Sequence, residues 1–407
     1  MENAKELTEC LACGGSKLRT VLDLNKQPLA NSFVPDGEDD EDTYPLCLNL
    51  CDDCSHLQLS HVVNPDYLFK HYLYVSGTTR TLQDNMSWFA GFVQEYTGFL
   101  RASVLDIGCN DGTQLDYFKN LGLKTYGIDP AENLYNTSSQ HHRVICDFFN
   151  DETSERFVEK YGTMDVVVAQ NSFAHVADPL EYLTALKKII APEGLFFIQT
   201  SQADMVLNDE FDTIYHEHVN FFNINSMSKL CERAGYKLVD VVKTPIHGTS
   251  YIFVLSPTQG NPYRISNLLE FERAAGLMNR TCYRSWVEKV NFTVNQFANM
   301  CEVFDRQRGY LLIGYGAAAK GNTLLNFSKV HLSMIIDDNP LKQGLFSPGR
   351  HIPVVSIDEL DNIDHNQPIM FVPLAWNFYK EIRQRILNKR NVKEDRFLKY
   401  FPEVWVE

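Results

Sequence analysis

The sequence lacks any uninterrupted apolar run long enough to span a membrane. Its first ten residues, MENAKELTEC, are polar and charged, without the apolar core of a secretory signal. Positive charge is also scarce, because 37 Lys and Arg residues stand against 52 Asp and Glu residues, a net charge of -15. This balance argues against nucleic acid or an anionic membrane surface as the main partner. We therefore expect a soluble, cytoplasmic protein that acts on a small molecule.

The chain has enough apolar residues for several folded cores. Its 407 residues are 44% hydrophobic and 12% aromatic, which argues against disorder. A chain of this length is expected to form about two to four domains. We expect a monomer or a weak homo-oligomer.

The ten cysteines, in a chain without a secretory signal, indicate thiols and metal binding rather than disulfides. Four of them form two Cys-x-x-Cys pairs: Cys10 with Cys13, and Cys51 with Cys54. Two such pairs can present four thiolates to Zn²⁺, and four protein ligands leave no open position for chemistry. The alternative is four ordinary buried thiols. Three other residues are possible substitute ligands whose spacing fits less well: Cys47, His56 and His61.

A glycine loop dominates the middle of the chain. An apolar strand at residues 104–107 runs into Gly108-x-x-x-Gly112 and then into a helix that starts near Gln114. Asp106 lies within that strand, where it would repel a pyrophosphate but suits the cationic amino-acid end of S-adenosylmethionine. Asp129 ends the next strand, about 20 residues on, where a carboxylate can bind both ribose hydroxyls. A nicotinamide dinucleotide is the alternative ligand. The candidate cofactor-binding residues are Asp106, Gly108, Asn110, Gly112, Asp129, Pro130, Asp147 and Asn171.

Strands and helices alternate from residue 104 to residue 200, which predicts a doubly wound, mostly parallel sheet of the α/β class. A helix is expected over residues 81–99, preceded by HYLYVSGTT with Tyr72 and Tyr74. A second α/β unit begins at Tyr310, where Gly316 and Lys320 stand at the start of a predicted helix and could hold a phosphate. That unit is either a second nucleotide site or a Rossmann-like packing unit.

The stretch Tyr215-His216-Glu217-His218 concentrates three titratable groups and a phenol in four residues. At strand period Tyr215 and Glu217 would point one way and the two histidines the other, whereas at helical period no two would share a face well. The imidazoles could bind a metal, or one could act as a general base. A pair of hydrogen-bonded histidines at the edge of a core is the third possibility.

Taken together, the doubled Cys-x-x-Cys, the glycine loop, the Tyr-His-Glu-His stretch and the unit GYGAAAKGNTLLN resemble the sugar C-methyltransferase family over essentially the whole chain. Members of that family methylate carbon 3 of nucleotide-linked 4-keto-deoxysugars. The resemblance implies a zinc-binding domain at residues 1–70, an S-adenosylmethionine domain at 71–255 and a C-terminal α/β domain at 256–407. It further implies a nucleotide sugar as substrate, dTDP- or GDP-linked.

The resemblance also implies roles for individual residues. His218 matches the family's base, and a tyrosine of the segment after the zinc domain is implicated. The candidate catalytic residues are His218, Tyr215, Glu217, His216, Tyr74 and Tyr72. The candidate substrate-binding residues are Lys320, Gly316, Asn322 and His175. An O- or N-methyltransferase acting on a small metabolite is the alternative enzyme, and a non-catalytic binding module with the same fold is the alternative outside enzymes.

Overall fold

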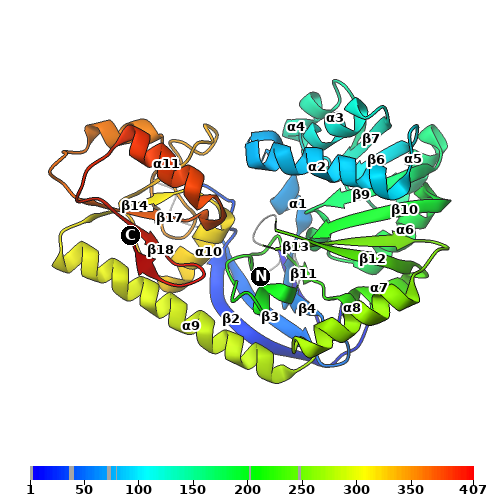
Figure 1. The fold of residues 1–407 in the computed structure, drawn as a ribbon, viewed down its shortest axis with the longest axis horizontal. Helices are drawn as coiled ribbons and strands as arrows, with labels where there is room; N and C mark the ends of the chain where they lie inside the picture. Colours follow the sequence, from blue (N-terminus) through cyan, green and yellow to red (C-terminus); the bar gives the residue numbers. More distant parts are fainter. Residues whose placement is uncertain (1–2, 36–40, 71–74, 79, 201–202, 246–248) are drawn as a thin grey trace.

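The computed structural model describes residues 3–35, 41–70, 75–78, 80–200, 203–245 and 249–407. Tyr72 and Tyr74 lie outside the described residues. The chain forms an N-terminal sheet, a central α/β lobe and a C-terminal α/β lobe (Figure 1). The two α/β lobes stand side by side, with the N-terminal sheet below and between them. The long helix α9 runs along the lower edge and joins the two lobes.

The N-terminal sheet contains one strand that comes from the central part of the sequence. Its order is β11-β4-β3-β2, and all its pairs are antiparallel. The strands are β2 (Leu18–Pro28), β3 (Thr43–Cys51), β4 (Leu57–Leu59) and β11 (Asn220–Phe221). A separate two-stranded sheet joins β1 (Ala4–Glu6) to β5 (His61–Val63).

The central sheet has the order β12-β13-β10-β9-β6-β7-β8, with only β13 running antiparallel to its neighbours. This is the arrangement of a class I methyltransferase, so the predicted fold class is confirmed. The strands are β6 (Ser103–Ile107), β7 (Lys124–Asp129), β8 (Arg143–Cys146), β9 (Met164–Gln170), β10 (Ile190–Thr200), β12 (Lys237–Thr244) and β13 (Ser250–Ser256).

Helices cover both faces of this sheet because each presents an apolar stripe to it. On one face, Phe89 of α2 and Phe118 of α3 pack with Val104 and Phe197. The other face is covered by α5, α6 and α7. The α-helices of the central lobe are α2 (Arg80–Thr97), α3 (Thr113–Asn120), α4 (Glu132–Ser138), α5 (Asp151–Tyr161), α6 (Pro179–Ile189) and α7 (Ile224–Ala234). The short helix α1 (Pro65–Phe69) belongs to the N-terminal part, where Leu68 packs near Val63. Short 3-10 turns are η1 (Ser76–Thr78), η2 (Phe173–His175) and η3 (Ala203–Val206).

The C-terminal lobe follows α8 (Pro262–Ala274) and α9 (Arg280–Glu302), which continues into the π-helical turn η4 (Val303–Gln307). Its sheet has the order β16-β15-β14-β17-β18-β19, parallel except at β19. The strands are β14 (Leu311–Tyr315), β15 (Met334–Ile336), β16 (Val354–Val355), β17 (Ile369–Pro373), β18 (Arg396–Lys399) and β19 (Trp405–Val406). The helices are α10 (Ala319–Ser328), η5 (Ile357–Asn362), η6 (Trp376–Phe378) and α11 (Tyr379–Lys389).

The three parts share hydrophobic cores and are not independent domains. One core joins Leu48 of β3, Phe211, Trp286 of α9 and Leu324 of α10. A second joins the cysteines of the N-terminal pairs to Leu230 of α7. The segment of residues 203–223 takes part in both, so it lies where all three parts meet.

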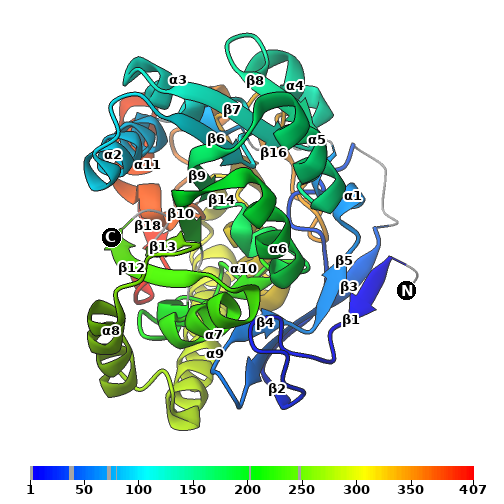
Figure 2. The ribbon, with the colours of Figure 1, turned by 90° about the vertical axis from the view of Figure 1, so that its right-hand side faces the viewer.

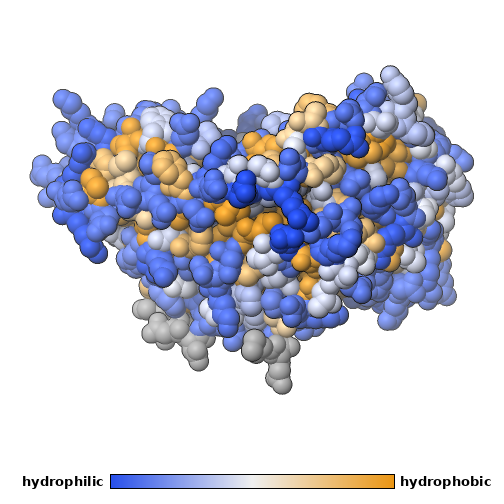
Figure 3. Space-filling view, turned by 90° about the horizontal axis from the view of Figure 1, so that it is seen from below, coloured by the Kyte–Doolittle hydropathy of each residue, from blue (hydrophilic) through white to orange (hydrophobic). Residues whose placement is uncertain are grey.

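The face seen from below is mostly hydrophilic, with an apolar band across its centre (Figure 3). Among the described residues, no helix is both long and apolar enough to cross a membrane.

Candidate active site

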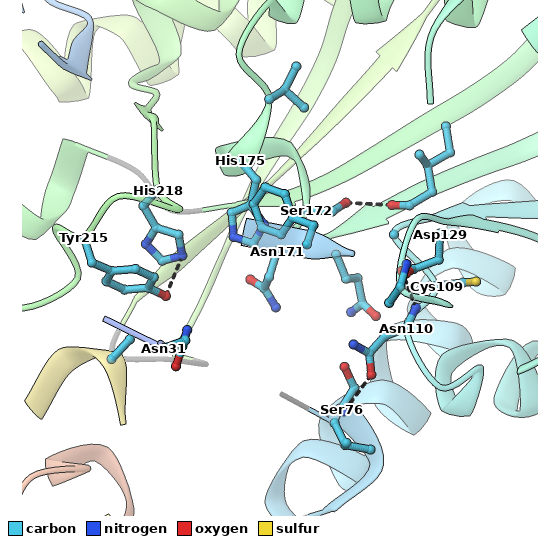
Figure 4. A pocket seen from close by; sticks show the side chains of 18 of the residues that line it. Asn31, Ser76, Cys109, Asn110, Asp129, Asn171, Ser172, His175, Tyr215 and His218 are labelled. Atoms are coloured by element: carbon cyan, nitrogen blue, oxygen red, sulfur yellow. Dashed lines mark hydrogen bonds between the residues drawn. The ribbon is translucent and has the colours of Figure 1, made fainter. Parts of the chain in front are cut away.

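A cavity of about 700 Å³ opens where the three parts of the chain meet. The N-terminal part contributes Asn31 and Phe69, the central lobe contributes the glycine loop, and the C-terminal lobe contributes residues 316–320. In the close-up, Tyr215 and His218 face Asn110 and Asp129 across the cavity (Figure 4). The carboxyl ends of β6, β7 and β9 form one wall, where ligands of parallel α/β sheets bind.

Gly108 and Gly112 of the glycine loop have a backbone conformation and a close packing that favour glycine. Gly108 has φ 86°, and a Cβ there would lie 2.5 Å from the Cβ of Ser172. The hydroxyl of Ser172 donates to the carbonyl of Ile107 at 2.6 Å, which holds it against the loop. Gly112, with φ 86°, caps α3 where a Cβ would press on Ser138, and it is not among the cavity-lining residues. Gly112 therefore sets the helix start, whereas Gly108 keeps the cavity open.

Asp106 brings a buried carboxyl to the floor of the cavity. Its side chain is 2% exposed, and Oδ1 has no hydrogen-bond partner among the described residues. Burial, reinforced by the charges of Asp129 and Asp111, raises the pKa of Asp106 to about 8. A buried carboxylate is costly unless a cation pairs with it. The site therefore fits the ammonium group of S-adenosylmethionine.

Three further polar atoms at the same end are buried without a partner among the described residues: Gln114 Oε1, Gln170 Oε1 and the hydroxyl of Tyr182. Buried polar atoms are normally hydrogen-bonded, so an unpaired group of them marks a place where a polar ligand binds. Sequence reasoning did not select these residues, because each stands on an apolar strand or helix face without a motif of its own.

Asp129 is held by the loop that it faces. Its Oδ2 accepts from the backbone N–H of Asn110, and its Oδ1 accepts from that of Ala131, both at 2.8 Å. Burial raises the pKa of Asp129 above its ordinary value. Asn110, with φ 50°, also accepts from the backbone N–H of Ser76 at 3.0 Å. The segment that follows Tyr72 and Tyr74 is thus tied to the glycine loop.

The remaining cofactor candidates lie around the same wall. Pro130, Asp147 and Asn171 line the cavity. The carboxylate of Asp147 pairs with Arg156 and accepts from the backbone N–H of Phe148. Asn171, with φ 56°, turns the chain at the end of β9. The structure therefore brings seven of the eight predicted cofactor residues to the cavity, with Gly112 behind them.

The Tyr-His-Glu-His stretch is a tight turn, neither a strand nor a helix. The backbone N–H of His218 donates to the carbonyl of Tyr215 at 2.9 Å and closes the turn. As a result Tyr215 and His218 share the side that faces the cavity, and His216 and Glu217 are absent from its lining. The expectation that no two of the four residues would share a side at helical spacing is wrong, because Tyr215 and His218 lie three residues apart, the spacing of neighbours on one side of a helical turn.

The hydrogen bonds of His218 fix its tautomer. Its Nδ1 lies 2.8 Å from the carbonyl of Thr213, which can only accept, so Nδ1 carries the proton. In the neutral ring Nε2 then holds the lone pair, and the hydroxyl of Tyr215 donates to it at 2.8 Å. The ring stacks on His175 at 5.3 Å, and His175 stacks on Phe69 at 5.2 Å. Burial lowers the pKa of His175 to about 4, so that ring is neutral.

The other two residues of the stretch hold the turn to neighbouring parts. His216 is 2% exposed and its Nε2 donates to the carbonyl of Tyr44 at 3.2 Å, away from the cavity. Burial lowers the pKa of His216 to about 4. Glu217 accepts from the side-chain amide of Asn31 at 2.5 Å. The structure does not bring either residue to the cavity as a catalytic group.

From the C-terminal lobe, Gly316 and Lys320 line the cavity at the start of α10. Lys320 Nζ also lies 4.8 Å from the ring centroid of Trp376. Asn322 is buried behind the cavity, where its amide donates to the carbonyl of Ala30 at 2.8 Å. Asn322 therefore holds the segment after β2 and does not line the cavity, contrary to its predicted role in substrate binding.

Two more titratable residues of the cavity were not selected from the sequence. Glu210 is 3% exposed, and burial raises its pKa to about 7, with Lys320 opposing the shift. Lys342 is 7% exposed and donates to the carbonyl of Ala317 at 2.7 Å. Their positions depend on contacts between lobes, for which the sequence holds no local signal.

The four predicted zinc ligands come together away from the cavity. Their sulfur atoms all lie within 4.8 Å of one another, with Cys10 3.5 Å from Cys54 and Cys13 3.6 Å from Cys51. Tetrahedral zinc with Zn–S bonds of about 2.3 Å separates its sulfur ligands by about 3.8 Å, so the cluster fits the ion. The three substitute ligands bond elsewhere: Cys47 to Asp23, His56 to Asn220 and His61 to Ser60. None of the four cysteines belongs to the described lining of the cavity.

Comparison with known proteins agrees with this geometry. The chain matches the model of a zinc binding domain at residues 10–69, of a methyltransferase domain at 78–241 and of a C-methyltransferase C-terminal domain at 245–402. It is 30% identical to C-methyltransferase NovU of Streptomyces niveus, over 98% of this chain and 96% of that protein. The ubiquinone biosynthesis O-methyltransferase of Colwellia psychrerythraea is 25% identical over 36% of this chain and 66% of its own length.

Among solved structures, that of 1,6-didemethyltoxoflavin-N1-methyltransferase from Burkholderia thailandensis with S-adenosylhomocysteine covers 44% of this chain and 80% of its own, at 18% identity and a TM-score of 0.35. The NovU match runs over nearly the whole of both chains, and the three domain models follow one another in order. The chain therefore belongs to the C-methyltransferase family, as an S-adenosylmethionine-dependent methyltransferase with a zinc-binding N-terminal domain.

Proposed function

We propose that the enzyme methylates carbon 3 of a nucleotide-linked 4-keto-6-deoxyhexose, and that His218 and Tyr215 remove the proton from that carbon. The observation that carries the proposal is the fixed tautomer of His218, with Nδ1–H bonded to Thr213 and Nε2 directed to Tyr215. An acceptor carbon must lose a proton before it can take a methyl group. A ketone at the neighbouring carbon makes that proton weakly acidic, within reach of an imidazole whose ordinary pKa is about 6.5.

Proton removal leaves negative charge on the keto oxygen, which becomes an enolate. The proton from carbon 3 ends on Nε2 of His218, either directly or through the hydroxyl of Tyr215, which lies 2.8 Å away. The resulting imidazolium is stabilised by the carbonyl of Thr213, because that carbonyl continues to accept from Nδ1. Neutral His175, stacked on His218, adds no charge that would oppose the protonation.

The cofactor end of the cavity fixes where the methyl group arrives. Asp106 and Asp129 would hold the ammonium group and the ribose of S-adenosylmethionine, which supplies the methyl group as a sulfonium. The substrate would then lie between these residues and the Tyr215–His218 pair, which faces Asp129 across the cavity (Figure 4). In this arrangement the carbanion face of the substrate would be turned toward the cofactor.

The C-terminal lobe would hold the nucleotide diphosphate. Gly316 and Lys320 line the cavity at the start of α10, and the N-terminus of a helix favours an anion. Lys320 adds a positive charge in a protein whose net charge is -15. We expect the diphosphate at this point, with the sugar directed toward His218.

Deuterium wash-in at carbon 3 tests the proposal. The enzyme, in ²H₂O and without the methyl donor, is expected to exchange the carbon 3 proton of a 4-keto sugar nucleotide. His218→Ala is expected to slow exchange by at least about a hundredfold, the usual scale of general-base catalysis. Tyr215→Phe separates the two proton routes, because direct transfer to Nε2 survives it and relayed transfer does not.

The control variant is His331→Ala, which removes an imidazole outside the cavity lining. Equal exchange by the native enzyme and His218→Ala would contradict the role of His218. Methyl transfer without any exchange, to a substrate that lacks the ketone, would instead indicate an O- or N-methyltransferase.

A further inference from the structure

We propose that Asn220 is a positioning residue that couples the zinc-binding cysteines to the His175–His218 stack. Asn220 opens β11, two residues after His218. It pairs across the sheet with Gln58 of β4, four residues after Cys54. The strand that leaves the catalytic turn is therefore bonded to the strand that leaves the second cysteine pair.

Backbone hydrogen bonds fasten the turn on both sides. The N–H of Val219 donates to the carbonyl of Ala174 at 2.8 Å, beside His175. The carbonyl of Val219 accepts from the N–H of Leu59 at 2.9 Å, on the N-terminal sheet. One residue, directly after His218, thus bridges the central lobe and the N-terminal sheet.

The side chain of Asn220 repeats this bridge. Its Oδ1 lies 3.2 Å from Nε2 of His56, and its Nδ2 donates to the carbonyl of Val176 at 2.7 Å. Both Asn220 and His56 are fully buried, at 0% exposure. Turning the amide over would break both hydrogen bonds and leave buried polar atoms unpaired, which costs free energy. The Asn220 side chain therefore has one favourable orientation.

These contacts bear on the two stacked imidazoles. Val176 directly follows His175, and Asn220 lies two residues from His218, so the amide spans the segments that carry both rings. The rings stack at a centroid distance of 5.3 Å with an interplanar angle of 26°. A displacement of about 1 Å at a reacting group can cost about a hundredfold in rate. Asn220 therefore governs a geometry on which the rate depends.

At the other end, His56 is placed by the second cysteine pair. The N–H of Cys51 donates to the carbonyl of His56 at 2.8 Å, and the N–H of Ser55 donates to the carbonyl of Cys51 at 2.9 Å. A tetrahedral ion would fix Cys51 and Cys54, and with them the turn that carries His56. The zinc site thus acts on the cavity through structure, although its ligands do not line it.

Asn225 provides a control beside the same cysteine pair. It stands on α7, which lies between α6 and α8 (Figure 2). Its amide donates to the carbonyl of Cys54 at 2.9 Å, and its backbone N–H donates to Glu272. Asn220→Ala removes a fully buried amide and Asn225→Ala a half-buried one, both near the Cys51–Cys54 pair. Only the first removes the connection to Val176.

The first test uses full-length, zinc-loaded protein and needs no substrate, although the inference rests on the role proposed for His218. Side-chain ¹⁵N NMR of the histidines is expected to show His218 as the Nδ1–H tautomer in the native protein and in Asn225→Ala. In Asn220→Ala we expect a tautomer mixture and faster amide exchange over residues 213–222, with zinc content unchanged. His56→Leu keeps Asn220 and breaks only its hydrogen bond to residue 56, and we expect this variant to change the tautomer and the amide exchange in the same direction.

The second test measures wash-in at carbon 3. Asn220→Ala is expected to lower it by about tenfold or more, and Asn225→Ala by less than about twofold. Native tautomer and exchange protection in both Asn220→Ala and His56→Leu would overturn the inference, as would equal effects of Asn220→Ala and Asn225→Ala. If the tautomer changes as expected but even the native enzyme shows no wash-in, the positioning role stands and the proposed substrate is wrong.

Discussion

Asp106→Asn tests two properties of this buried carboxyl: the proton that it holds in the ligand-free protein, and the negative charge that it would offer to the ammonium group of S-adenosylmethionine. Burial raises its pKa from 3.8 to about 8, so between these values the folded protein holds a proton that the unfolded chain has released. The stability linked to Asp106 is therefore complete below pH 3.8 and is lost as pH rises toward 8. Each rise of one pH unit in that window lowers the free energy of unfolding of the ligand-free protein by up to about 1.4 kcal/mol.

Asp106→Asn has no proton to lose, so its stability should lack this slope. From pH 5.5 to 7.5 we expect the variant to gain up to roughly 3 kcal/mol on the native protein, about 5–10 °C in Tm for a domain of this size. Calorimetric melting of ligand-free protein across that pH range measures the difference. Removing one partner of a buried charge pair costs about 2–5 kcal/mol, so S-adenosylmethionine should bind at least about thirtyfold more weakly.

The control is Asp165→Asn, which alters a carboxylate at the start of β9, outside the cavity. Its Oδ2 accepts from the N–H and hydroxyl of Ser103, so this variant should melt lower but bind S-adenosylmethionine as the native protein does. Parallel pH profiles of Asp106→Asn and the native protein, or cofactor affinities within about threefold by calorimetry, would refute the reasoning about burial.

Three further outcomes are expected. Gly108→Ala should abolish cofactor binding by calorimetry, because the added Cβ would clash with Ser172 in the cavity wall. Gly122→Ala, with φ 87° against 86° at Gly108 but open space around it, should lower only stability. Equal cofactor binding by the two variants would contradict this. Metal analysis of protein purified without added zinc should find one equivalent, and Cys10→Ser should lose it together with its folded melting transition; a folded, loaded variant would count against the site. Trp376→Phe removes the hydrogen bond that the indole N–H donates to Asp212 at 2.7 Å. This variant should have a Tm about 4 °C lower and an unchanged cofactor affinity. An unaltered Tm would show that this hydrogen bond between lobes contributes nothing to stability.

The parts of the site that the sequence predicted are those built from local motifs. Asp106, Gly108 and Asp129 fall within one strand–loop–helix–strand unit, whose geometry follows from short-range hydrogen bonding. The doubled Cys-x-x-Cys predicted the sulfur cluster for the same reason, because each pair forms a tight turn. The alternation of strands and helices gave the central fold.

What the sequence could not show depends on contacts between distant segments. Asn31 meets Glu217 across 186 positions, and Asn220 meets His56 across 164. The turn at residues 215–218 was not predicted either, because strand alternation places Tyr215 with Glu217, whereas the turn places Tyr215 with His218, three residues on. His216 was therefore kept among the candidate catalytic residues beside His218, although the turn directs it toward Tyr44.

The most direct test of the account is the position of the transferred carbon. Methyl-¹³C S-adenosylmethionine and a nucleotide-linked 4-keto-6-deoxyhexose are incubated with the native enzyme, and the product is examined by ¹³C NMR. The account predicts a labelled methyl group bonded to a quaternary carbon 3 beside an intact ketone. A labelled methyl group on oxygen or nitrogen, or one at a carbon not adjacent to the ketone, would contradict it.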